Sequence, residues 1–170
     1  MNSNQHQHSV GLALLQTMIG SGFTSHLFKQ LRKERGIGYS PEASYDSIRG
    51  NAVFYMGVAG LHPNQVEQAV DVIKGIVGKM CKELVDEKFF VGKKTQLESE
   101  YLNIMESPKM HAGAWIGKEF DRPFYDFRTL LDNLKGVSRE SLREISNENF
   151  SGEPLILIAS APGYKTRFNK

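Results

Sequence analysis

Residues 20–40 read GSGFTSHLFKQLRKERGIGYS, and this stretch decides how the rest of the chain is interpreted. It begins with three small residues, which end one helix and predict a loop. Thr24 or Ser25 can cap a short amphipathic helix that presents apolar side chains to the core and basic ones to solvent. Gly36 closes this helix, so we expect a helix, a glycine hinge and then the start of a strand.

Arg32 lies near the end of this helix and Tyr39 near the start of the strand, with six residues between them. This spacing is expected to bring the Arg32 guanidinium and the Tyr39 phenol close to each other. Both groups can donate hydrogen bonds to a peptide carbonyl or to an oxyanion. From spacing alone another interpretation stays open, in which Arg32 is a surface charge beside Lys33 and Arg35, and Tyr39 is a half-buried strand residue.

Apolar periodicity and turn residues predict the other elements. We expect an apolar helix over 10–19, strands over 37–48 and 52–59 with a turn at 49–51, helices over 64–84, 86–107, 107–120, 125–134 and 138–150, and a closing strand at 155–159 buried on both faces. Asn64, Asp86, Ser107 and Ser138 are the expected helix caps. The fold class is α+β, with a mainly antiparallel sheet packed by several helices. Three strands make a poor sheet for so many helices, so further strands are expected from a part of the protein not present here, or from another chain.

Residues 10–170 are expected to form a single, partial domain. Residues 1–9 are polar, and we expect them to be disordered or extended. His6 and His8 lie on this segment, where two ligands on a mobile end make a poor metal site. Sheet edges left open by missing strands favour dimerisation or strand exchange, so a homodimer is one expected partner state.

Composition and charge exclude several classes of protein. Hydrophobic content of 40% and charged content of 24% are ordinary for a globular protein, and a net charge of +2 is too small to indicate nucleic-acid or membrane binding. No apolar run reaches the roughly 18 residues that span a bilayer, and VGLALLQTMIG at 10–20 lacks the basic residues of a signal peptide. The single cysteine, Cys81, excludes an internal disulfide and is expected to be a buried, unreactive thiol.

The sequence contains no complete catalytic site and no metal site. A zinc peptidase needs about three ligands on rigid elements, yet the histidines form no H-x-x-E-H or H-E-x-x-H motif. Glu98, Glu100 and Glu106 lie on one expected helix without a histidine, and we interpret them as a solvated, ion-pairing face. No serine lies in a G-x-S-x-G turn, and Cys81 has no histidine beside it. This chain alone is therefore not expected to be an enzyme.

The stretch at 20–40 resembles the second half of pitrilysin/insulinase-type zinc peptidases, a family that includes the mitochondrial processing peptidase. That half looks like ggG-F-S-S-R-L-F-x-x-L-R-x-x-x-G-x-x-Y-S followed by a hairpin. The resemblance covers about residues 10–162, with less specific similarity in the later helices. It implies half of a clamshell, whose homologous partner half carries H-x-x-E-H and zinc on the same or a separate chain. No cofactor is expected in this chain itself.

The resemblance also implies roles for particular residues. Arg32 and Tyr39 match the family's pair that reaches across the chamber to the substrate and the catalytic centre. The residues that match its small-residue loop, a candidate peptide contact, are Gly20, Ser21 and Gly22. His26 stands where arginine is usual, which puts any contact of that arginine in doubt. The family's second half begins with strands, which only nine polar residues replace here, so a shortened gene or a fragment is expected.

The leading hypothesis is a substrate-binding, non-catalytic half of a zinc-dependent endopeptidase that cleaves extended or unfolded peptides. Arg32 and Tyr39 would orient the substrate and stabilise the oxyanion. The alternative is a structural subunit of the same fold without peptidase activity. A third hypothesis, nucleic-acid binding through KQLRKER at 29–35, is disfavoured by the overall charge. The resemblance implies a soluble protein of the bacterial cytoplasm or periplasm, or of the mitochondrial matrix.

Overall fold

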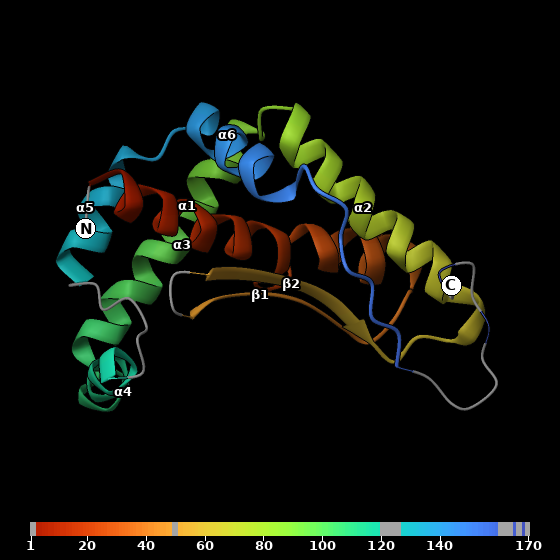
Figure 1. Ribbon diagram of the computed structural model, residues 1–170, viewed down its shortest axis with the longest axis horizontal. Coiled ribbons are helices and arrows are strands. Elements are labelled where there is room, and N and C mark those ends of the chain that lie inside the picture. Colours follow the sequence, from red (N-terminus) through yellow and green to blue (C-terminus); the bar gives the residue numbers. More distant parts are fainter. Residues whose placement is uncertain (1–2, 49–50, 120–126, 160–164, 166–167, 169–170) are drawn as a thin grey trace.

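The computed structural model describes residues 3–48, 51–119, 127–159, 165 and 168 (Figure 1). Its elements in chain order are α1 (Ser3–Gly20), η1 (Phe28–Lys33), β1 (Ser40–Ile48), β2 (Asn51–Ala59), η2 (Pro63–Gln65), α2 (Val66–Lys82), α3 (Glu87–Glu106), α4 (Pro108–Glu119), α5 (Phe127–Gly136) and α6 (Arg139–Phe150). Helices pack with an antiparallel hairpin, which confirms the α+β class. No helix in these ranges is long and apolar enough to cross a bilayer.

Helix α1 forms the centre of the core, because apolar residues occupy most of its circumference. The side chains that are at most 1% exposed are Val10, Leu12, Leu14, Leu15, Met18 and Ile19. Strand β1 contacts α1, and so do α3, α5 and α6. In Figure 1 the hairpin lies below α1, while α2 and α6 lie above it. The apolar pattern at 10–19 predicted this burial, which places α1 between the hairpin and the outer helices.

Helix α1 also extends through the described part of the segment 1–9, so the expectation of a disordered or extended segment is wrong there. Contacts with residues far along the chain stabilise this polar end. Gln7 Nε2 donates to the Gly136 carbonyl at 3.2 Å, and His8 Nδ1 lies 3.5 Å from a carboxylate oxygen of Glu148. Helices gain most of their stability from tertiary packing, and sequence periodicity does not reveal such long-range partners.

Strands β1 and β2 pair in antiparallel register, from Ser40 opposite Ala59 to Ile48 opposite Asn51. Both strands were predicted, while residues 49–50 of the predicted turn lie outside the described residues. One face of the hairpin packs on the core. The other face is open to solvent, and Tyr55 on that face is 57% exposed. In the described part of the chain no further strand pairs with either edge.

The closing strand predicted at 155–159 is not formed, so that prediction is wrong. Leu155 is 97% exposed and Leu157 is 90% exposed, whereas Ile156 and Ile158 are half-buried. Apolar composition indicated burial on both faces, but a strand also needs a hydrogen-bonded neighbour. Within the described residues only β1 and β2 pair, and this segment instead borders an apolar groove beside β2 and α2.

The later helices follow the predicted order. Asp86 and Ser138 cap α3 and α6 by accepting hydrogen bonds from backbone N–H groups, as predicted. The start of α2 differs, because the short turn η2 precedes it. His62, not Asn64, occupies the cap position of η2, and Gln65 is the residue before α2. The Asn64 side chain is instead 2.8 Å from His62 Nδ1. The predicted helix limits at 120 and 125 lie outside the described residues.

Cys81 is half-buried near the end of α2. Its Sγ donates to the Ser146 carbonyl at 3.5 Å, and burial raises the pKa of the thiol. A raised pKa lowers the fraction of reactive thiolate, which supports the predicted unreactive thiol.

Candidate functional site

The site begins with the helix at 26–35, whose middle part, η1, is π-helical. Ser25 Oγ accepts a hydrogen bond from the Phe28 N–H at 3.3 Å and caps the helix, as predicted. Leu27 and Leu31 are fully buried and attach the helix to the core. Short π-helical turns occur frequently at functional sites, which directs attention to the polar side chains of this helix.

Two glycines turn the chain from this helix into β1. Gly36 and Gly38 have φ angles of +63° and +66°, in the left-handed region that other residues rarely adopt. The Ile37 N–H donates to the Leu31 carbonyl at 2.8 Å, and the Gly36 N–H donates to the Arg32 carbonyl at 3.1 Å. These bonds satisfy carbonyls at the helix end and fix the direction in which β1 leaves.

The hinge brings Arg32 and Tyr39 together. Arg32 Nη1 donates to the Gly38 carbonyl at 2.8 Å, and Arg32 Cζ lies 5.4 Å from the centroid of the Tyr39 ring. The Tyr39 N–H donates to the Ala59 carbonyl at 2.7 Å, which attaches the tyrosine backbone to β2. Tyr39 is 73% exposed, so it is not the half-buried strand residue of the alternative interpretation. The structure therefore presents a guanidinium and a phenol side by side to solvent.

The loop of Gly20, Ser21 and Gly22 is fixed at both ends. A Cβ at Gly20 would collide with the backbone of Ala43 in β1, so glycine allows the end of α1 to approach the strand closely. Gly22 has a φ of +76°, and its carbonyl accepts the Ser25 N–H at 3.1 Å. Nothing lies within 4 Å of a Cβ placed at Gly22, so the outer side of the loop is open.

Lys93 is a residue that the sequence reasoning missed. Its side chain is on α3 and only 2% of the residue is exposed, yet Nζ donates to the Ser21 carbonyl at 2.6 Å and to Gln96 Oε1 at 3.0 Å. Burial lowers the pKa of this ammonium. The sequence spacing could have predicted that Lys93 is buried, because it falls on the same helical face as the buried Phe90 and Leu97. The buried Lys93 thus attaches the loop of Gly20, Ser21 and Gly22 to α3.

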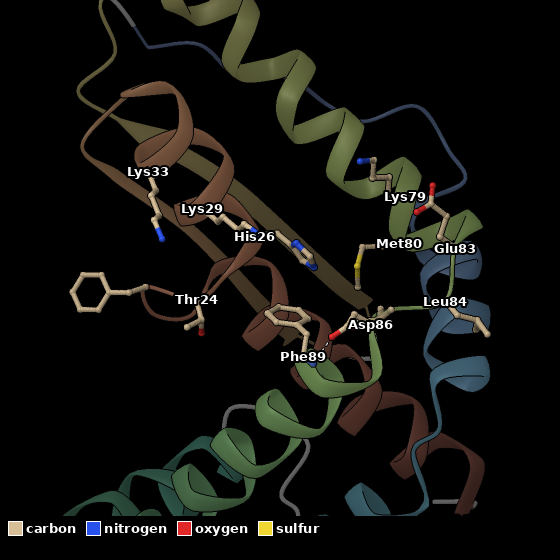
Figure 2. A pocket seen from close by; sticks show the side chains of 12 residues that line it. Thr24, His26, Lys29, Lys33, Lys79, Met80, Glu83, Leu84, Asp86 and Phe89 are labelled. Carbon is tan, nitrogen blue, oxygen red and sulfur yellow. Dashed lines mark hydrogen bonds between the residues drawn. The ribbon is translucent and has the colours of Figure 1, made fainter.

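His26 lies half-buried on the other side of the helix start, against the Phe89 ring at 4.7 Å between centroids. Its Nε2 is buried with no hydrogen-bond partner among the described residues. Burial lowers the pKa of His26, and the positive charges of Lys29, Lys93 and Lys79 lower it further. Figure 2 shows His26 on the wall of a pocket of about 580 Å3 that lies between this helix, α2 and α3.

Within residues 3–48, 51–119 and 127–159 no three His, Cys, Asp or Glu side chains form a group that could hold a metal. His62 pairs with Asn64, and the ring of His111 packs on Phe127 at 5.5 Å. The chemistry that this site offers is hydrogen bonding and positive charge.

Residues 1–97 match the sequence pattern of the peptidase M16 inactive domain. The chain belongs to the peptidase M16 family. It is 22% identical over 164 residues to an uncharacterized zinc protease, YmxG, of Bacillus subtilis (strain 168), covering 93% of this chain and 39% of that protein. It is 27% identical over 119 residues to the mitochondrial-processing peptidase subunit beta of Dictyostelium discoideum, covering 66% of this chain and 23% of that protein. A protease from Helicobacter pylori has the same fold, with a TM-score of 0.71 at 17% identity over 85% of this chain and 35% of that one.

These matches confirm the family that the stretch at 20–40 predicted, and they assign the chain to the M16 half described as inactive. The chain spans less than two fifths of the length of either M16 relative.

Proposed function

We propose that this chain is the substrate-binding, non-catalytic half of a zinc-dependent endopeptidase, with Arg32 and Tyr39 as its contacts to the scissile peptide. The observation that carries the proposal is the adjacent, solvent-facing pair formed by these two side chains. The names of the relatives, a zinc protease and a processing-peptidase subunit, support the reaction class.

The geometry suits stabilisation of negative charge on an oxygen atom. Among the described residues, Arg32 donates one guanidinium hydrogen bond, from Nη1 to the Gly38 carbonyl. Because a guanidinium has five N–H donors, others can donate to a substrate carbonyl. The Tyr39 hydroxyl can donate to the same oxygen. Because the glycine hinge and the bond to Ala59 fix the backbone, the donors are held in place before the substrate arrives.

The loop of Gly20, Ser21 and Gly22 is proposed as a contact for the peptide backbone. Its small residues leave the outer side open, and Lys93 fixes its position from the core side. Zinc and the water that it activates would come from a homologous partner half, on the same or a separate chain. The residues of this chain would bind an extended peptide, orient its carbonyl and stabilise the developing oxyanion.

The test is to reconstitute the chain with a zinc-bearing M16 half and measure turnover of an unfolded peptide. Tyr39→Phe should lower kcat by roughly tenfold or more, as expected for the loss of one oxyanion donor. The matched control is Tyr55→Phe, which changes an exposed tyrosine of β2 and should leave kcat unchanged. Equal turnover of the wild type and Tyr39→Phe would remove Tyr39 from the mechanism. A stable complex that never cleaves peptide would support the structural-subunit alternative.

A further inference from the structure

The pocket beside His26 is separate from the Arg32–Tyr39 pair and has no role in the proposed function so far. Lys29 and Lys33 reach it from the helix at 26–35, Lys79 from the end of α2, and Phe89 from the start of α3 (Figure 2). Its volume of about 580 Å3 is within the range of small-ligand pockets, so it can accept one or two side chains of a peptide.

Positive charge predominates in this pocket. No carboxylate of the described residues forms an ion pair with Lys29, Lys33 or Lys79. Two acidic residues also line it, Glu83 and Asp86, and Asp86 is engaged as the cap of α3 through the Phe89 N–H at 2.9 Å. Three ammonium groups therefore line the pocket with two carboxylates, one of which already accepts a backbone N–H, and this excess of positive charge favours an anionic ligand.

The pocket also has an apolar part. Met80 is buried in its wall, and Leu84 is 41% exposed at its side. Phe23 is 81% exposed and packs edge-to-face on Phe28 at 5.0 Å between centroids, so its ring is held in place while facing solvent. Exposed aromatic and aliphatic side chains next to these ammonium groups suit a ligand that carries both a negative charge and an apolar group.

The pocket follows the peptide-contact loop directly in the chain. Gly22 is the last residue of that loop, and Phe23 and Thr24 are already lining residues of the pocket. A peptide that runs across the open side of Gly22 therefore reaches the pocket within one or two residues. His26 also lines this pocket, and its Nε2 is buried without a partner among the described residues, so it is a candidate partner for a polar ligand atom.

We propose that this pocket is a subsite for an acidic residue of the peptide substrate, flanked by an apolar residue. The carboxylate binds between Lys29, Lys33 and Lys79, and the apolar neighbour packs on Phe23 and Leu84. This inference rests on the proposed function, because it assumes that the ligand is an extended peptide. It adds a preference for acidic substrates that the Arg32–Tyr39 pair alone would not produce.

The test measures binding to the chain alone by fluorescence anisotropy, with no zinc-bearing half present. The probes are two labelled decapeptides that differ only at the central residue, Leu-Glu-Phe in one and Leu-Gln-Phe in the other. The wild type should bind the Glu peptide about five- to tenfold more tightly, as expected for three partly exposed ion pairs. This preference should shrink as salt is raised.

The double variant Lys29→Gln/Lys79→Gln should lose the preference. The matched control, Lys82→Gln/Lys88→Gln, removes two exposed lysines from α2 and α3 that do not line the pocket, and it should keep the preference. Equal affinity for the two peptides, no measurable binding of either, or an equal loss in the control variant would each overturn the subsite.

The outcome also separates this inference from the proposed function. Tyr39→Phe should keep the preference for the Glu peptide, because Tyr39 does not line the pocket. If the preference survives while Tyr39→Phe has no effect on turnover, the oxyanion role fails and the subsite stands. If Tyr39→Phe lowers turnover but neither peptide is preferred, the subsite alone fails.

Discussion

Replacing Lys93 with methionine tests whether a buried ammonium holds the loop at 20–22. Methionine preserves most of the length and the apolar stem of lysine, so the packing on α3 is retained. What is removed is the ammonium, with its bond to the Ser21 carbonyl at 2.6 Å, its bond to Gln96 Oε1 at 3.0 Å and its position 5.8 Å from the centroid of the Phe89 ring. The variant therefore separates the interactions of the ammonium from the burial of the side chain.

The magnitude follows from two opposing effects. A hydrogen bond to a charged group contributes about 1.5–3 kcal/mol to stability. Methionine avoids the cost of burying an ammonium, a cost that also lowers the pKa of Lys93. Water can reach the half-exposed Ser21, and Gln96 already donates to Glu100 at 3.0 Å, so neither partner is left wholly without bonds. We expect a net loss of about 1–2 kcal/mol, or about 2–8 °C in Tm.

The assay is urea unfolding at neutral pH, with limited proteolysis to follow opening of the loop. Lys88→Met is the matched control, because Lys88 is exposed on the same helix. Lys93→Met should have a lower urea midpoint than this control and should be cleaved faster near residues 20–22. A free energy of unfolding of Lys93→Met within about 0.5 kcal/mol of that of Lys88→Met, with an unchanged cleavage rate, would refute the reasoning.

Two further predictions concern packing and pH. Gly20→Ala should destabilise the chain by about 1–3 kcal/mol because its Cβ collides with Ala43, whereas Gly75→Ala, with open space on the exposed side of α2, should stabilise it by up to about 1 kcal/mol. Urea midpoints check both, and equal effects of the two substitutions would contradict the close contact. In the folded state the pKa of His26 is lowered below its ordinary value of 6.5. Near and below pH 6.5 the unfolded state therefore binds more protons than the folded state, so the free energy of unfolding decreases as the pH falls from 6.5 toward the pKa of the folded state. His26→Gln should therefore lose less stability than the wild type between pH 7.5 and 5.5, and equal losses would show that His26 is not the group responsible.

The Arg32–Tyr39 pair could be predicted because its geometry is local. A capped helix, a glycine hinge and a strand start follow one another within twenty-one residues, and six residues separate the two side chains. Short-range signals of this kind depend on backbone preferences that the sequence displays directly. The burial of α1 was predictable for a related reason, because apolar residues occupy most of its surface between residues 10 and 19.

The features that the sequence did not reveal depend on contacts across long stretches of chain. The bond from Lys93 to Ser21 joins residues 72 positions apart, and the N-terminal turn of α1 depends on Gly136 and on residues of α6. The segment at 155–159 has the composition of a strand, but its state depends on whether a neighbouring strand is available to pair with it. Its composition alone could not predict that.

The most direct test of the central claim is to tag this chain, recover its complex from the native source, and measure bound zinc and peptide cleavage in the same sample. The account predicts a complex that contains zinc and cleaves an unfolded peptide, with cleavage abolished by a chelator. A stable complex that contains neither zinc nor cleavage activity would contradict the account and favour a structural role for this M16 domain.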